Sequence, residues 1–249
     1  MWIKICGITR PEDAVAAVEF GASAIGLNFF SGSKRCVSIE VAQEIVRAVL
    51  PDAASEPWGW LPVCQPSVAE RQAGSLPHRI DIVGVFVNSA PEDILQISAA
   101  VGLSAVQFHG EESVADIAKV RAGSPNLHLI RALRISSDRR QDCFDHLRDL
   151  QSHVELFAVL LDTFVPGEFG GTGVTVDPQL VADYGTQNLP RLILAGGLSP
   201  DNVAAAVTAC QPWGVDTASG VESSPGIKSS EKVNRFITEA RRSAVATLP

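Results

Sequence analysis

The chain has 249 residues, 46% of them hydrophobic, a length that supports one large barrel or two small domains. Its net charge of −8 makes nucleic acid a poor partner, and the lack of a leader peptide or a bilayer-length apolar run predicts no membrane partner. Its five cysteines are odd in number and show no C-x-x-C spacing, which argues against a disulfide framework or a zinc site and is typical of a cytoplasmic protein.

Eight short apolar runs follow one another along the chain, and a helix-like stretch follows each of them. We expect strands at 2–6, 24–28, 82–87, 104–108, 127–132, 157–162, 191–195 and 214–218. We expect helices near 11–20, 38–49, 91–101, 111–122, 137–150, 177–185, 200–210 and 229–245. Eight strand–helix units in series predict a single (β/α)8 TIM-barrel domain over 1–249. A doubly wound open sheet is the alternative, but that fold gives no reason for eight matched units.

One segment interrupts the alternation of strands and helices, between the second helix and the third strand. Residues 51–79 are rich in Pro, Ala and Ser and replace what is normally a short turn. Their place in the chain puts them on the amino-terminal face of the barrel. That face is opposite the mouth, the end formed by the carboxyl ends of the strands, where catalytic residues lie in this fold. We interpret them as an insertion in a surface loop, although Trp58 and Trp60 leave a partner surface open.

The first strand ends in a thiol. Cys6 is followed by Gly7, which leaves room for a ligand, although a lone cysteine in such a place is often only a small buried hydrophobe. Lys4 lies on the same face of the strand, one dipeptide repeat or about 6.6 Å away, and its charge would favour the thiolate and lower the pKa of Cys6. A buried ammonium needs a counter-ion. Because strand eight neighbours strand one in a closed barrel, we expect a Lys4–Asp216 pair inside it.

A single carboxylate ends the apolar sixth strand. Asp162 could simply cap the next loop, or it could act as a general acid, because burial at an apolar strand end raises the pKa of a carboxyl group. In the second case Cys6 and Asp162 would face each other across the mouth of the barrel. That arrangement suits the transfer of a proton from one atom of a sugar to another.

Glycine-rich turns follow the last three strands. The candidate positions are Gly171 and Gly173 after strand six, Gly196 and Gly197 after strand seven, and Ser219 and Gly220 after strand eight. One such turn is weak evidence, and three ordinary tight turns are the alternative. Turns of this kind after strands seven and eight together are typical of a phosphate site made of backbone N–H groups, so we expect a small phosphorylated molecule as the ligand.

Three more polar side chains are expected at the mouth. Arg35 lies in the loop after strand two, where it could hold a substrate carboxylate or be a solvated loop residue. Gln107 and His109 share the inward face of strand four. A lone histidine is more often a structural donor than a catalyst, so we interpret His109 as a residue of the site wall.

The opening hexapeptide Lys4-Ile5-Cys6-Gly7-Ile8-Thr9 resembles the signature of the phosphoribosylanthranilate isomerases, a family of tryptophan biosynthesis. The likeness covers the whole chain apart from 51–79. Further motifs fall where that family has them: Ser33-Lys34-Arg35, Gly84-Val85-Phe86-Val87-Asn88, Gln107-Phe108-His109-Gly110-Glu111-Glu112, Leu160-Leu161-Asp162-Thr163, Gly170-Gly171-Thr172-Gly173, Gly196-Gly197-Leu198, and Ser219-Gly220-Val221-Glu222 with Pro225-Gly226.

The resemblance implies an aldose–ketose isomerisation, the Amadori rearrangement of N-(5-phosphoribosyl)anthranilate to 1-(2-carboxyphenylamino)-1-deoxyribulose 5-phosphate. It implies that Asp162 protonates the furanose ring oxygen, that Cys6 removes the proton on C2′, and that Arg35 holds the anthranilate carboxylate. The glycine turns would hold the phosphate. It also implies that no metal or cofactor is needed and that the chain is a monomer or a homodimer.

Two other functions stay open at this point. A sister phosphate-binding barrel, an aminoimidazole-carboxamide ribotide isomerase or a dual-substrate isomerase, usually has aspartates at strands one and five, whereas strand one here ends in Cys6. A phospho-ligand-binding barrel without activity would have no use for Cys6 and Asp162 together.

Overall fold

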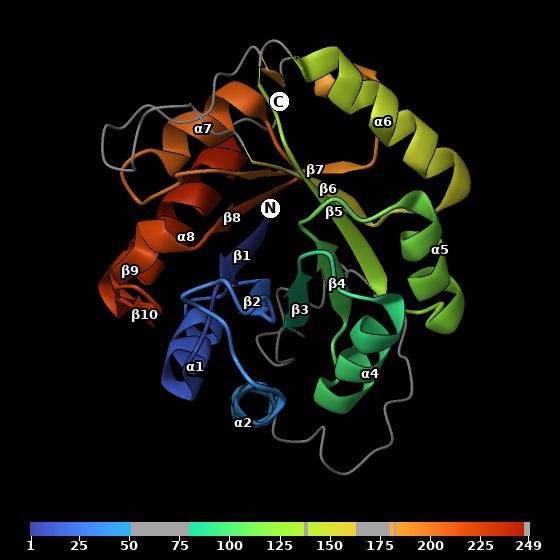
Figure 1. Ribbon diagram of the computed structural model, residues 1–249. Helices are drawn as coiled ribbons and strands as arrows, with labels where there is room; N and C mark the ends of the chain where they lie inside the picture. The colour runs from blue at the N-terminus through green and yellow to red at the C-terminus, as the bar shows by residue number, and fades with distance from the viewer. Residues whose placement is uncertain (51–79, 137–138, 163–179, 182, 247–249) are drawn as a thin grey trace, which may run out of the picture.

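The computed structural model describes residues 1–50, 80–136, 139–162, 180–181 and 183–246. At its centre eight parallel strands form a closed barrel in which each strand pairs with the next and β8 pairs with β1 (Figure 1). The strands are β1 (Trp2–Cys6), β2 (Ala24–Asn28), β3 (Asp81–Phe86), β4 (Ala105–Phe108), β5 (His128–Arg134), β6 (Ala158–Asp162), β7 (Arg191–Ala195) and β8 (Gly214–Thr217). The expected (β/α)8 barrel is confirmed.

Helices surround the ring of strands, as Figure 1 shows. They are α1 (Pro11–Glu19), α2 (Ile39–Val49), α4 (Pro91–Val101), α5 (Val114–Gly123), α6 (Arg140–His153), α7 (Val203–Cys210) and α8 (Ser230–Ala246). Local sequence explains several of their ends. Proline occupies the first turn of α1 and of α4, where its missing N–H costs nothing. Ser38 caps α2 by accepting a hydrogen bond from the Val41 N–H, and Gly102 ends α4 with φ of 77°.

The strands bury side chains on both faces, because helices cover the outside and the barrel interior is filled. Residues such as Ile3 and Ile5 face the helices and are fully buried. The alternate residues fill the interior with mostly small and branched side chains: Trp2, Ala24, Val83, Ala105, Ile130, Ala132, Ala158, Leu160, Ile193 and Ala195. At the amino-terminal end Trp2 stacks on Trp213 with ring centroids 5.5 Å apart, which closes the floor of the barrel.

Two segments differ from the expected elements. A helix was expected over 177–185, but the described part of this stretch holds a 3-10 helix, η4 (Tyr184–Thr186). After β8 the chain forms a second 3-10 helix, η5 (Ser219–Val221), and then a small antiparallel sheet of β9 (Glu222–Ser224) and β10 (Ile227–Lys228) that the sequence did not predict. The expected insertion at 51–79 lies outside the described residues.

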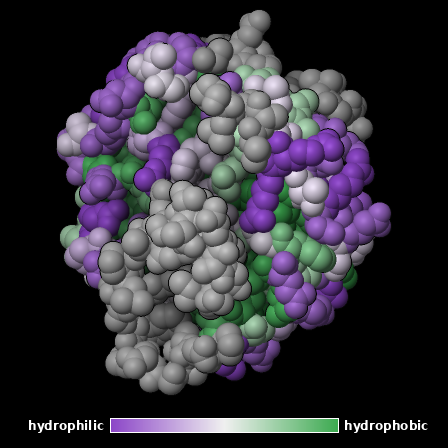
Figure 2. Space-filling view, turned by 180° about the vertical axis from the view of Figure 1, so that it is seen from behind, coloured by the Kyte–Doolittle hydropathy of each residue, from purple (hydrophilic) through white to green (hydrophobic). Residues whose placement is uncertain are grey.

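Hydrophilic side chains predominate along the rim of one face of the molecule. In Figure 2, which views the molecule from behind, hydrophilic side chains occupy much of the outer rim, and hydrophobic ones show mainly between them. This is the pattern expected for amphipathic helices packed on a barrel. Among the described helices, none combines the length and the apolar character that crossing a bilayer requires.

Candidate active site

The inward-facing positions at the carboxyl ends of the strands carry polar groups. Cys6 ends β1 and Asp162 ends β6, and because all eight strands are parallel, both side chains lie at the same end of the barrel. Both are partly exposed. The thiol and the carboxyl group therefore share one end of the barrel; their accessibility to a ligand and their catalytic roles stay predictions.

Lys4 lies on the inward face of β1 and is fully buried. Its Nζ donates to Asp216 Oδ2 on β8 and to Gln107 Oε1 on β4, both at 2.9 Å. Burial alone would lower the pKa of Lys4, but the neighbouring Asp216 and Cys6 outweigh it, and the pKa is raised. Lys4 is therefore an ammonium ion, and the expected Lys4–Asp216 pair is confirmed.

Gly26 of β2 provides the room in which the thiol and the ammonium lie side by side. A Cβ at this position would come within 2.7 Å of Cys6 Sγ and 2.9 Å of Lys4 Cε. Burial raises the pKa of Cys6, Lys4 opposes the rise, and Asp216 adds to it. Lys4 lowers this pKa, as predicted, but the expected net decrease is wrong, because the loss of solvation outweighs the effect of Lys4. Cys6 thus rests as a thiol at neutral pH.

Asp162 lies in surroundings that favour its protonated form. Burial raises the pKa of its carboxyl group, and His109 and Arg134 oppose that rise without cancelling it. This is the direction expected from the sequence. Arg134 was missed, because β5 runs two residues beyond the expected strand and places Arg134 opposite Asp162 in the register of β5 and β6.

Gln107 and His109 form one wall of the mouth. Gln107 is buried, and its Nε2 lies 2.9 Å from Nδ1 of the partly exposed His109. Burial lowers the pKa of His109. The loop that carries His109 is anchored by the buried Glu112, which accepts hydrogen bonds from the Gly110 N–H at 3.1 Å and from Arg131 Nη1 at 2.5 Å. Sequence reasoning missed this anchor, since its two partners come from different elements and share no local pattern.

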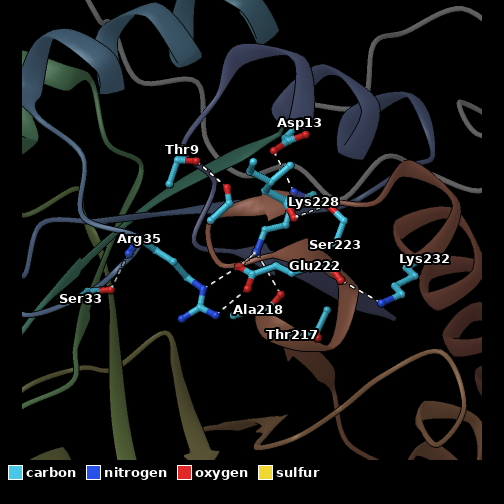
Figure 3. Close-up of polar contacts among 12 residues, drawn as sticks. Thr9, Asp13, Ser33, Arg35, Thr217, Ala218, Glu222, Ser223, Lys228 and Lys232 are labelled. Carbon is cyan, nitrogen blue, oxygen red and sulfur yellow. Dashed lines mark hydrogen bonds and ion pairs between the residues drawn. The ribbon is translucent and has the colours of Figure 1, made fainter.

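Arg35 takes part in an ion-pair network that Figure 3 shows in close-up. Its Nε and Nη2 donate to the two carboxylate oxygens of Glu222, each at 2.6 Å. Lys228 Nζ donates to Glu222 Oε1 at 2.9 Å and to the Ala218 carbonyl at 3.0 Å. Burial opposes the charge on Glu222, but the hydrogen bonds from both cations outweigh it and lower the pKa of Glu222. The network joins the loop after β2 to the β9–β10 sheet.

The backbone at Gly7 lets Arg35 reach this position. Gly7 has φ of 69°, a conformation that favours glycine, and a Cβ there would collide with the side chain of Arg35. Arg35 thus lies across the turn that follows Cys6. The sequence placed Arg35 at the mouth but did not anticipate Glu222 and Lys228 as its neighbours.

Glycines bring the loops after β7 and β8 together at one corner of the mouth. Gly196 and Gly197 have φ of 96° and 60°. A Cβ at Gly220 would collide with the carbonyl oxygen of Leu198, and Thr217 Oγ1 donates to the same oxygen at 2.7 Å. The two loops are therefore in direct contact, and no larger residue fits at Gly220.

The remaining expected anion-site positions divide into two groups. Ser219 begins η5 beside this corner and is exposed. Gly171 and Gly173 lie outside the described residues. Across the described part of the chain, His, Cys, Asp and Glu side chains form no cluster of three that could hold a metal ion.

The fold and this site define an enzyme of the (β/α)8-barrel class, with its functional groups at the carboxyl ends of the strands. Within that class, the sequence model of N-(5'-phosphoribosyl)anthranilate (PRA) isomerase matches residues 59–239. The chain belongs to this family.

Relatives with known names support the assignment over nearly the whole length. An N-(5'-phosphoribosyl)anthranilate isomerase of Pseudomonas fluorescens is 39% identical over 243 residues, covering 96% of this chain and 95% of the relative. The crystal structure of phosphoribosyl anthranilate isomerase from Thermotoga maritima is similar with a TM-score of 0.75 and 34% identity, covering 97% and 99% of the two chains. A phosphoribosyl anthranilate isomerase in complex with reduced 1-(o-carboxyphenylamino)-1-deoxyribulose 5-phosphate is similar with a TM-score of 0.72 and 32% identity, covering 97% and 99%.

Proposed function

We propose that this chain isomerises N-(5′-phosphoribosyl)anthranilate to 1-(2-carboxyphenylamino)-1-deoxyribulose 5-phosphate, an Amadori rearrangement in tryptophan biosynthesis. The observation that carries the proposal is the thiol of Cys6 and the carboxyl group of Asp162 at one mouth of the barrel, in a chain of this family. The enzyme would act in the cytoplasm, where a free thiol stays reduced.

The first step is opening of the sugar ring. Asp162 donates its proton to the furanose ring oxygen, the bond between that oxygen and C1′ breaks, and its electrons stay on oxygen. The anthranilate nitrogen supplies its lone pair to C1′, which leaves an iminium cation and an Asp162 carboxylate. The raised pKa of Asp162 supports this role, because a general acid must hold its proton close to neutral pH.

The second step is removal of the proton on C2′ by Cys6. The thiol first loses its own proton to solvent, and the Lys4 ammonium and the new iminium cation both favour the resulting thiolate. The thiolate takes the C2′ proton, and the electrons of that C–H bond neutralise the iminium to an enolamine, which tautomerises to the ketone. The substrate nitrogen is the electron sink for this step.

Binding is assigned to the groups around this pair. Glu222 occupies only two of the five N–H donors of Arg35, so the others can hold the anthranilate carboxylate. Asp216 Oδ1 is buried and has no hydrogen-bond partner among the described residues, which suits it to accept a bond from a sugar hydroxyl. Gln107 and His109 line the wall of the site. The phosphate is assigned to the glycine corner: Gly171, Gly173, Gly196, Gly197, Ser219 and Gly220.

Fluorescence-monitored turnover of freshly prepared phosphoribosylanthranilate tests the proposal. Cys6→Ser and Asp162→Asn should each lower kcat/KM by about 10²–10⁴-fold, the range for loss of a positioned acid or base. Cys143→Ser is the matched control, because this thiol lies on α6 and burial raises its pKa to about 11. The control should keep full activity. Near-normal kcat/KM in both site variants would refute the assigned roles.

A further inference from the structure

A chain of polar side chains runs across the interior of the barrel just below the mouth. Asp216 on β8 accepts from Lys4 on β1, Lys4 donates to Gln107 on β4, and Gln107 contacts His109 beyond the end of β4. Each of the three N···O or N···N distances is 2.9 Å. Lys4 and Gln107 are buried and join strands that are not neighbours in the ring, so the contact passes through the barrel itself.

The charge on Lys4 fixes the direction of every hydrogen bond in this chain. An ammonium ion only donates, and Asp216 Oδ2 and Gln107 Oε1 accept from Lys4. The amide oxygen of Gln107 must therefore face Lys4, which turns its NH₂ group toward His109. An amide NH₂ can only donate, so Nδ1 of His109 must be the acceptor and carry no proton.

We propose that Gln107 is a positioning residue that, clamped by Lys4, holds His109 as the neutral tautomer with its proton on Nε2. The consequence for catalysis rests on the proposed function. A neutral imidazole keeps a positive charge away from Asp162, which leaves that carboxyl group free to hold the proton that it gives to the sugar. Nε2–H is then an uncharged donor at the mouth.

The charged groups that act on His109 come from four strands and oppose one another. Asp162 on β6 and Asp216 on β8 favour a cationic ring, whereas Lys4 on β1 and Arg134 on β5 disfavour it. Burial disfavours it most, and the pKa of His109 is lowered. A cationic His109 would lower the pKa of Asp162, which is the change that the bond from Gln107 prevents.

Nitrogen-15 NMR of protein labelled at histidine tests the tautomer directly, because protonated and unprotonated ring nitrogens have well-separated shifts. The resonances of His109 are identified by their loss in His109→Gln. In the wild type at neutral pH we expect Nε2 protonated and Nδ1 unprotonated. His128 is the internal control: it lies at the start of β5, at the other end of the barrel.

Gln107→Glu replaces the NH₂ donor by a carboxylate of the same shape that still accepts from Lys4. We expect Nδ1 of His109 to become protonated and the pKa of His109 to rise by about 1 to 3, while the shifts of His128 stay unchanged. In the same variant the falling, alkaline limb of the kcat/KM profile should move to lower pH, because a cationic His109 lowers the pKa of Asp162.

The outcomes are separable. A proton on Nδ1 of His109 in the wild type overturns the proposal, whatever the activity, and so does a Gln107→Glu variant whose His109 signals and pH profile match the wild type. If the wild type and the variant show the expected signals but no phosphoribosylanthranilate turns over, the positioning role stands and the proposed function fails.

Discussion

Replacing Asp216 by leucine should destabilise the barrel strongly, because it leaves the Lys4 ammonium buried without its counter-ion. The side chain of Lys4 is 0% exposed and that of Asp216 is 9% exposed, and the pair is 2.9 Å apart. At an effective dielectric constant of about 20, unit charges at this distance attract by about 6 kcal/mol. Removing one partner of a buried pair costs about 3–5 kcal/mol once solvation is included. For a chain of this size that lowers Tm by about 6–20 °C.

Urea and thermal unfolding followed by circular dichroism measure this effect. The double variant Lys4→Met/Asp216→Leu removes both charges and should recover most of the lost stability, since apolar replacements of buried pairs are often neutral. Lys119→Ala is the control, because Lys119 is 62% exposed and its contact with Asp116 is 3.4 Å, so the change should cost under about 1 kcal/mol. A single Asp216→Leu variant within about 1 kcal/mol of the wild type, or a double variant as unstable as the single one, would refute the reasoning.

Three other variants test the mouth. Gly26→Ala should cost about 1–3 kcal/mol through overpacking and reduce turnover, whereas Gly185→Ala, which has open space around it, should leave both unchanged. Burial raises the pKa of Asp162, so the fold favours the protonated carboxyl group and loses stability as that group ionises with rising pH. Asparagine resembles the protonated form; Asp162→Asn should therefore match the wild type in Tm below pH about 3.9 and exceed it at pH 7. Glu222 has a lowered pKa, so its carboxylate stabilises the fold above pH about 4.3, and this stabilisation is lost as the pH falls further. The Tm of Glu222→Gln should therefore fall less than that of the wild type on acidification below that pH; an equal fall in both proteins would contradict this.

The strands and their order follow from sequence because they depend on local patterns. Apolar runs such as 158–161 are buried on both faces, and parallel strands joined by helices leave a closed ring as the simplest arrangement. Ring closure alone predicted that Lys4 meets Asp216, since it makes β1 and β8 neighbours. A buried ammonium needs an anion, and Asp216 was the acidic residue near the end of that strand.

The parts that sequence did not predict depend on contacts without a local pattern or on a balance of magnitudes. Arg35 and Glu222 are 187 positions apart; Arg35 lies in the loop after β2, and Glu222 begins β9, after the last barrel strand. The β9–β10 sheet has strands of three and two residues, which are too short for a periodic signal. Burial and Asp216 raise the pKa of Cys6, and Lys4 lowers it; the sequence supplies the neighbours but not the degree of burial.

The seam between β1 and β8 also bears on how the molecule is made. Lys4 and Asp216 are register partners 212 positions apart, so the loop that this pairing closes is almost the whole polypeptide, and such long-range contacts form slowly. A ribosome-bound chain stalled after β6 already contains Cys6 and Asp162 but lacks β7 and β8, the two strands that complete the ring. The ring of strands therefore closes only when the eighth strand has left the exit tunnel and docked on β1.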